Sequence, residues 1–280
     1  MNATPETLRA RAKILREIRA FFDARDFVEV ETAVRLAAPA PECHIDCPPV
    51  ATGGFLRASP ELQMKKLLAA GMDRIYEIGP CFREGERGSR HNPEFTMIEW
   101  YRRAADYRVI QDDLAALLTT LRGEETPLET ITVRTAYQRW AGWDPWTAWD
   151  ADRFDFDMAT KIEPALATLS GGVFLIDYPC ACASLARTRG DVAERWEFYW
   201  HGLELANCFT ELCDADEQRA RFIRERAARQ ALGEADYPFD EDFFRALPQI
   251  GSAAGVALGV DRLVMVLTGE MTIASVRAGE

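Results

Sequence analysis

The chain has 280 residues, with 33 Lys plus Arg against 45 Asp plus Glu and a net charge of −12 at pH 7. This length fits one large domain or two small ones, and the 48% of hydrophobic residues predicts a buried core. The acidic balance argues against a protein whose main task is to grip nucleic acid, because a basic field supplies most of that affinity. It does not exclude a local basic patch.

The cysteines and the hydropathy indicate the compartment. Seven cysteines are an odd number in a chain too large to need disulfides, so we expect reduced thiols. Their spacings do not match zinc or thioredoxin motifs, which argues against a metal site through sulfur. The sequence has no signal-peptide pattern and no apolar run near the roughly 20 residues that span a bilayer. We therefore expect a cytoplasmic protein without membrane contact.

The first predicted element is a helix over residues 7–23, where apolar side chains recur at helical spacing. Arg9, Lys13 and Arg16 fall between them and form a basic side. This side is either a solvated surface or one face of a docking site for a partner. Residues 26–32 then alternate like a strand.

A proline-rich loop and a second helix follow. The loop contains Glu42 and His44, and we interpret His44 as a loop residue and not as a ligand. Ser59 has the chemistry of an N-cap, Pro60 suits the first helical position, and Glu61 complements the helix dipole. These three residues therefore predict a helix start.

The stretch Phe82–Tyr101, FREGERGSRHNPEFTMIEWY, carries the most specific chemistry. It is typical of two strands joined by a polar turn with Gly85 and Gly88, and residues 74–78 form a strand that leads into it. Period-two alternation then places an aromatic ring, a carboxylate and a phenol on one face. Rings stack on bases, Arg and His hold phosphate oxygens, and a carboxylate binds an ammonium. The candidate ligand-binding residues of this hairpin are Arg83, His91, Phe95, Met97, Glu99 and Tyr101. The alternative is that the stretch is an ordinary amphipathic hairpin without a ligand.

The second half of the chain is less regular. Residues 122–172 are the least informative, and their tryptophans are interpreted as a loop-rich packing cluster. The predicted elements are a helix over 106–121, a strand over 173–178, two strands over 194–212 around His201-Gly202, and a charged helix over 214–233.

Two features of this half bear on function. Strict alternation places Glu204 and Glu211 on opposite strand faces, and a bulge near Ala206 would bring them to one face. Residues 255–263 predict a strand that runs into a helix. Arg262 then lies in the first helical turn, beside N–H groups that favour phosphate.

Residues 82–101 resemble motif 2 of the class II aminoacyl-tRNA synthetases in the form used by lysyl-tRNA synthetases. The resemblance is strongest to their short relatives, which attach lysine or β-lysine to elongation factor P. All three class II motifs are matched in order: motif 1 at about residues 10–36, motif 2 at about 80–102 and motif 3 at about 254–268. The resemblance implies one α+β catalytic domain over residues 1–280, an antiparallel sheet flanked by helices, and a homodimer.

Four positions depart from the lysyl-tRNA synthetase pattern, and one of them is Gly85, where that family has the motif-2 Glu of the adenine edge. Ala33 replaces a motif-1 Pro, which weakens the expectation of a dimer, and Cys208 replaces a Gly. Ala257 replaces a Gly and is shared with the elongation-factor ligases, where its methyl group would reshape the amino-acid pocket.

The family resemblance also implies the site residues. Arg83 and Arg262 would be catalytic, and either Glu84 or Glu86 would reach the adenine edge. The implied ATP-binding residues are Arg83, Glu84, Gly85, His91, Asn92, Phe95, Glu204, Leu205, Gly259 and Arg262. The implied amino-acid site is Ser59, Pro60, Glu61, Glu99, Tyr101, Asn207, Phe209, Glu211 and Ala257, and Glu197 with Glu204 would bind Mg²⁺.

The resemblance implies ATP-dependent activation of lysine or (R)-β-lysine to an adenylate, followed by transfer to a lysine of elongation factor P. Motif 1 starts within the first ten residues, so we expect no anticodon-binding barrel and no tRNA acceptor. The alternatives are a tRNA-charging core, a small-molecule amide ligase, and an inactive regulatory paralogue. An inactive paralogue would be expected to have lost Arg83, Glu204 or Arg262, and the sequence retains all three.

Overall fold

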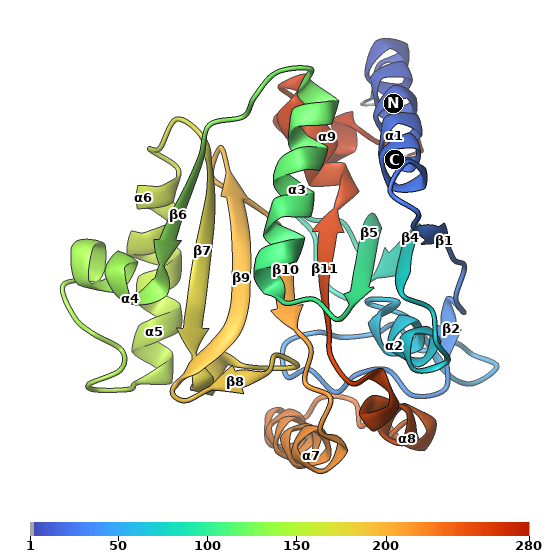
Figure 1. The fold of residues 1–280 in the computed structure, drawn as a ribbon, viewed down its shortest axis with the longest axis vertical. Coiled ribbons are helices and arrows are strands. Elements are labelled where there is room, and N and C mark those ends of the chain that lie inside the picture. The colour runs from blue at the N-terminus through green and yellow to red at the C-terminus, as the bar shows by residue number, and fades with distance from the viewer. Residues whose placement is uncertain (1–2, 280) are drawn as a thin grey trace.

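The computed structural model describes residues 3–279 and is built around a nine-stranded sheet with the order β1-β4-β5-β11-β10-β9-β7-β6, in which β8 pairs with β9 (Figure 1). All pairs are antiparallel except β1–β4 and β6–β7, so the expected antiparallel sheet carries one parallel strand at each edge. A small separate sheet pairs β2 with β3. The strands are β1 Val28–Glu29, β2 Arg35–Leu36, β3 Phe55–Leu56, β4 Arg74–Phe82, β5 Glu94–Arg103, β6 Leu128–Thr132, β7 Gly172–Pro179, β8 Thr188–Arg189, β9 Val192–Trp200, β10 Leu203–Thr210 and β11 Ala253–Gly259.

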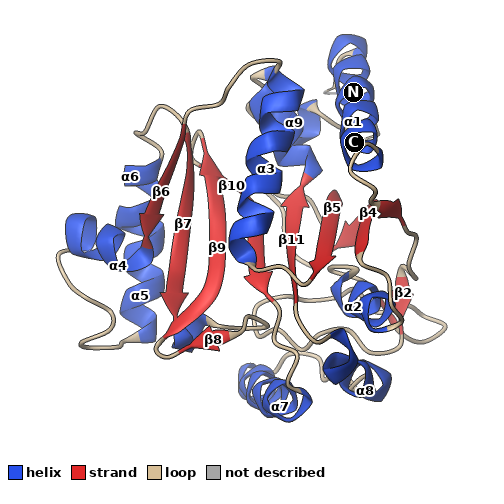
Figure 2. Cartoon of the chain, viewed as in Figure 1, coloured by secondary structure: helices blue, strands red, loops and turns tan. Residues whose placement is uncertain are grey.

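Helices flank this sheet (Figure 2). Within residues 3–279, no helix is both long and apolar enough to cross a membrane. The α-helices are α1 Pro5–Asp23, α2 Glu61–Ala69, α3 Tyr107–Arg122, α4 Val133–Ala136, α5 Ala151–Asp157, α6 Glu163–Leu166, α7 Ala215–Leu232, α8 Glu241–Ile250 and α9 Val260–Thr268. Short π-helical segments are η1 Tyr137–Ala141 and η2 Met158–Ile162, and short 3-10 helices are η3 Cys180–Cys182 and η4 Ile273–Ser275.

Most of the helices and strands predicted from the sequence are present in the structure, with a few differences in their bounds. The helices expected over 106–121 and 214–233 are confirmed as α3 and α7, each N-capped by an aspartate and closed by a left-handed glycine. The strand expected over 26–32 is wrong in length, because only Val28 and Glu29 pair with the edge of β4. Residues 122–172 form β6 and short helices that pack outside β7 (Figure 1), where three tryptophans support a separate apolar cluster.

Alternation along the central strands gives the sheet two unlike faces. The side chains on one face are apolar and buried, and α1, α3 and α9 cover them. Those of the opposite face are mostly polar and line a cavity. The covered residues include Ile98 and Trp100 of β5, Trp196 and Phe198 of β9, Cys208 of β10, and Val256 and Leu258 of β11.

The C-terminal segment packs against α1 (Figure 1), where Arg11 Nη1 donates to the Val276 carbonyl oxygen at 3.5 Å. Arg11 of α1 reaches inward, and its Nη1 lies 2.6 Å from Oδ1 of Asp261 at the start of α9. Asp261 is buried, and its other oxygen accepts a 2.8 Å hydrogen bond from the amide of Thr96 in β5. The outward basic residues of α1 are exposed, but Arg11 belongs to the interior.

This ion pair predicts unequal effects of two substitutions in α1. We expect Arg11→Ala to lower the free energy of unfolding by about 3 kcal/mol, because it leaves the buried Asp261 carboxylate short of a partner. Arg19→Ala breaks an exposed pair with Glu29 and should change stability by less than about 1 kcal/mol. Urea unfolding of both variants measures the difference, and equal losses would contradict the role given to Asp261.

Candidate active site

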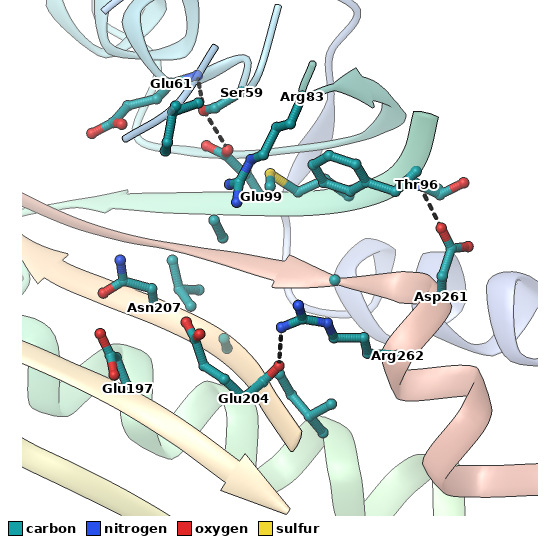
Figure 3. Close-up of a pocket in the computed structure, with 18 of the residues that line it drawn as sticks. Ser59, Glu61, Arg83, Thr96, Glu99, Glu197, Glu204, Asn207, Asp261 and Arg262 are labelled. Atoms are coloured by element: carbon teal, nitrogen blue, oxygen red, sulfur yellow. Dashed lines mark hydrogen bonds between the residues drawn. The ribbon is translucent and has the colours of Figure 1, made fainter. Parts of the chain in front are cut away.

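A cavity of about 390 Å³ opens on the polar face of the sheet. Side chains from β5 and from β9–β10 face each other across it, and Arg262 enters from the start of α9 (Figure 3). Nearly all of the predicted site residues line this one cavity. These are Ser59, Glu61, Arg83, His91, Asn92, Phe95, Glu99, Tyr101, Glu197, Glu204, Leu205, Asn207, Phe209, Glu211, Ala257, Gly259 and Arg262.

Small residues of β11 form the floor of the cavity. Ala257 pairs with Glu99 of β5 on one side and with Asn207 of β10 on the other. Gly255 faces Tyr101, and a Cβ atom there would lie 2.1 Å from two atoms of the tyrosine ring. The missing side chain therefore makes room for Tyr101.

A β-bulge brings the polar residues of β10 to the same face. Glu204 pairs with Tyr199 and Ala206 with Phe198, so Leu205 is an extra residue in β10. Leu205 and Ala206 then both belong to the apolar cluster, whereas Glu204 and Glu211 both line the cavity. The bulge predicted near Ala206 is confirmed.

Glu99 is held by two hydroxyl groups. Ser59 Oγ donates to Glu99 Oε1 at 2.6 Å, and Tyr101 Oη donates to Oε2 at 2.8 Å. Burial and the nearby Glu61 raise the pKa of Glu99 to about 8, although both hydroxyl groups work in the opposite direction. An ammonium group placed beside this buried carboxyl would favour its ionised form.

The helix start at Glu61 differs slightly from the prediction. Helix α2 begins at Glu61, so Pro60 takes the N-cap position and not the first helical position. Ser59 still provides the capping contact, since its Oγ accepts the Glu61 amide hydrogen at 2.9 Å. Ser59 therefore joins the start of α2 to Glu99 (Figure 3).

Glu211 shares a buried lysine with Glu61. Lys65, 1% exposed, forms an ion pair with Glu211 Oε2 and donates a 2.6 Å hydrogen bond to Glu61 Oε1. Glu211 Oε1 is buried without a hydrogen-bond partner among the described residues. Burial raises the pKa of Glu211 to about 8 in spite of Lys65. Lys65 was not among the predicted site residues, because its spacing from Glu61 is that of an ordinary helical pair.

Arg83 brings positive charge into the cavity from the end of β4. Its guanidinium carbon lies 5.2 Å from the centre of the Phe95 ring, and its Nε is buried without a hydrogen-bond partner among the described residues. Glu86 lines the cavity 3.6 Å from Arg83. Glu84 is exposed and lies outside the cavity lining. Of the two glutamates, Glu86 is therefore placed to reach a ligand.

Arg262 is held by groups from two neighbouring segments. Its Nη1 donates to the Glu204 carbonyl oxygen at 2.8 Å, and its Nε donates to the Arg90 carbonyl oxygen at 3.2 Å. Its Nη2 lies 2.7 Å from His91 Nε2. Burial and Arg262 lower the pKa of His91, which suits a neutral ring that accepts this hydrogen bond.

Glu197 and Glu204 differ in their surroundings. Glu197 Oε2 accepts 2.6 Å hydrogen bonds from the phenols of Tyr178 and Tyr199, and Oε1 pairs with Arg195. Glu204 has no such set of donors on its carboxylate among the described residues. Its pKa is raised to about 7, first by burial and then by Glu197. Glu204 is therefore the more available oxygen ligand.

Some lining residues were missed, and three predicted ones do not line the cavity. Pro60, Glu84 and Gly85 are absent from the lining. Arg195 lines the cavity and donates a 3.1 Å hydrogen bond to Asn207 Oδ1. It could have been predicted, because it precedes Glu197 by two residues and strand alternation places both on one face. Glu42 also lines the cavity, and burial together with Glu61 raises its pKa to about 7. Glu42 lies in a loop without periodicity, so the sequence carried no comparable signal.

The comparisons with known proteins agree with this geometry. Residues 2–278 match the family model of tRNA synthetases class II (D, K and N). The chain is 38% identical to the elongation factor P–(R)-β-lysine ligase of Mannheimia succiniciproducens, over 94% of this chain and 91% of that protein. It is 37% identical to the proteins of the same name from Proteus mirabilis and Pasteurella multocida, over 99% of this chain and 95% of each relative.

The Ser59–Glu99 contact predicts a measurable titration. In wild type we expect the Glu99 carboxyl to titrate near pH 8, and Ser59→Ala should raise this pKa further because it removes a donor to the ionised form. Carboxyl-selective ¹³C NMR follows the titration, and Glu99→Gln assigns the resonance by removing it. An unchanged or lower pKa in Ser59→Ala would contradict the contact.

Proposed function

Because this chain belongs to the class II tRNA synthetases of the D, K and N type, we propose that it activates lysine or (R)-β-lysine with ATP and transfers it to a lysine side chain of elongation factor P. One observation carries the proposal. A single cavity combines the cations Arg83 and Arg262 with buried carboxylates of Glu99 and Glu211. Cations of this kind suit phosphates, and buried carboxylates suit ammonium groups.

The strand register supports a separation of these two functions along the cavity. Gly259, just before α9 and Arg262, pairs with Met97 at one end of the β5–β11 pair, Phe95 lies two residues before Met97, and Glu99 lies two residues after it. We assign the adenine to Phe95 and the phosphates to Arg83, His91 and Arg262. The amino acid then lies over Ala257, with its amino groups toward the carboxylates.

The proposed reaction has two steps. The amino-acid carboxylate attacks the α-phosphorus of ATP, and pyrophosphate leaves as the adenylate forms. The amine of the acceptor lysine then attacks the adenylate carbonyl carbon, and AMP leaves. Arg83 and Arg262 orient the phosphates and stabilise the charge that develops on them, without a covalent protein nucleophile.

We also propose Mg²⁺ as the counterion of the phosphates. Mg²⁺ prefers carboxylate and phosphate oxygens, and it neutralises phosphate charge when bound. Glu204 fits this role because its carboxylate is the less engaged of the two predicted ligands. Glu197 fits less well as a main ligand, since three donors already occupy its oxygens. We therefore assign the metal contact chiefly to Glu204.

We propose a protein as the acceptor and not tRNA. The names of the relatives support elongation factor P, and the net charge of −12 provides little long-range attraction for a polyanion. A homodimer remains part of the proposal through the motif-1 resemblance. The docking role suggested for Arg9, Lys13 and Arg16 loses support, because α1 covers the sheet face opposite the cavity.

The nucleotide site predicts the effect of losing either arginine. We expect Arg83→Ala and Arg262→Ala each to reduce amino-acid-dependent pyrophosphate exchange about 100-fold or more, because one charge-assisted contact to the reacting phosphate is worth on the order of 3 kcal/mol. Arg87→Ala is the control, since Arg87 is exposed on the same loop and does not line the cavity. Circular dichroism checks the fold, and full exchange activity in either variant would refute the assigned site.

The proposed function predicts both the amino acid and the acceptor. Pyrophosphate exchange should be fast with lysine or (R)-β-lysine and about 10³-fold slower with norleucine, which leaves a buried carboxylate unpaired. The labelled amino acid is then offered to purified elongation factor P and to bulk tRNA in parallel. We expect the labelled amino acid to become attached to elongation factor P and not to tRNA.

Two outcomes would contradict the proposal in different ways. Equal exchange with norleucine would refute the amino-acid site. Efficient charging of tRNA with no label on elongation factor P would refute the acceptor and favour a tRNA-charging core.

A further inference from the structure

Lys65 has an unusual position for a lysine. It lies on α2 four residues after Glu61 and is 1% exposed, whereas its neighbour Lys66 is partly exposed and pairs with Asp240 outside the cavity lining. A buried lysine is costly unless it is paired. Burial alone would lower the pKa of Lys65, but Glu211 and Glu61 outweigh it and raise this pKa. Lys65 is therefore a fixed positive charge under the cavity.

Lys65 contacts one oxygen of each of two cavity glutamates. Its Nζ binds Glu61 Oε1 at 2.6 Å and pairs with Glu211 Oε2. The second oxygen of Glu211, Oε1, is buried and unpartnered among the described residues. A buried acceptor left in this state indicates a ligand group that donates to it. Glu61 Oε2 is likewise not engaged by Lys65.

We propose that Lys65 is the positioning residue that makes this cavity selective for diamino acids. It ties Glu61 to Glu211 and leaves one oxygen of each glutamate for an ammonium group of the substrate. The tie fixes the separation of these two acceptor oxygens and therefore the spacing of the two amino groups. This inference rests on the proposed function, because it concerns the amino-acid end of the same site.

Lys65 also favours the ionised form of Glu211. Without its charge, Glu61, Glu99 and Glu211 would be three carboxyl groups in one partly closed space with no lysine beside them, and the pKa of Glu211 would rise further. Lys65 lowers the pKa of Glu211, which burial holds at about 8. The titratable groups around Glu211 are Lys65 and Glu61 of α2, Glu99 and Tyr101 of β5, Cys208 of β10, and Cys213 beyond it.

The test compares Lys65→Met with Lys66→Met, which removes the neighbouring lysine without touching the cavity. In pyrophosphate exchange, we expect Lys65→Met to raise the KM for lysine or (R)-β-lysine about tenfold or more. The KM for ATP should stay within about twofold of wild type. The rising limb of kcat/KM against pH should move to higher pH by at least about one unit, since Glu211 must be ionised to bind an ammonium. Lys66→Met should retain the wild-type values.

Further variants separate positioning from a merely structural role. Lys65→Arg keeps the charge and should restore the pH profile, and Lys65→Gln replaces Lys65→Met if the latter does not fold. In a Glu211→Gln background, Lys65→Met should have a much smaller effect on the KM for lysine, because the two residues act through one contact. A structural role alone would lower thermal stability and leave KM and the pH profile unchanged.

The outcomes distinguish this inference from the proposed function. If wild type activates neither lysine nor (R)-β-lysine, the proposed function fails, and the selectivity role of Lys65 fails with it. If wild type activates them and Lys65→Met matches Lys66→Met in KM and pH profile, the proposed function stands and the inference about Lys65 is overturned.

Discussion

The period of two in four neighbouring strands is the constraint on which the site depends. In β5, β11, β10 and β9, one set of alternate residues is apolar and covered by helices, and the other set faces the cavity. A slip of one residue would turn the carboxylates into the apolar layer, which makes the register strongly specified. The extra residue Leu205 is part of this specification, because it turns Glu204 to the same side as Glu211.

The second constraint is charge. Placing several carboxylates in one cavity would be unfavourable unless cations or hydroxyl groups accompany them. Each carboxylate has its own arrangement: Ser59 and Tyr101 hold Glu99, Lys65 holds Glu211, and Arg195 with two phenols holds Glu197. These partners keep the side chains in place before a ligand arrives. Preorganisation of this kind lowers the entropy that binding must remove.

Much of the fold was predictable because the spacing of apolar and polar residues within a short segment indicates a helix or a strand. The cavity face of β5 followed from alternation alone, and the helical patterns over 106–121 and 214–233 predicted α3 and α7. The family motifs then supplied the roles of Arg83 and Arg262. A bulge in β10 could be inferred because Glu204 and Glu211, two glutamates expected in one site, had opposite parity.

The residues that escaped prediction depend on contacts distant in sequence. Nothing in the sequence sets Arg11 apart from the exposed cations of α1, and only the fold places it beside Asp261, 250 residues later in the chain. Lys65 has the helical spacing of an ordinary surface pair with Glu61, and only the fold buries it beside Glu211. The loop with Glu42 has no period, and the buried Arg229 of α7 fixes it by donating to the Glu42 carbonyl oxygen at 2.8 Å.

The contacts of the Arg262 guanidinium link the strand register and the charge arrangement to ligand binding. Its guanidinium contacts two carbonyl oxygens and the neutral ring of His91, and it contacts no carboxylate among the described residues. Asp261, the adjacent residue, also lines the cavity, but it pairs with Arg11 and Arg277. Arg262 therefore enters the cavity without an ion-pair partner among the described residues. A phosphate oxygen is a stronger acceptor than a neutral imidazole, so nucleotide binding would replace a weaker contact with a charge-assisted one.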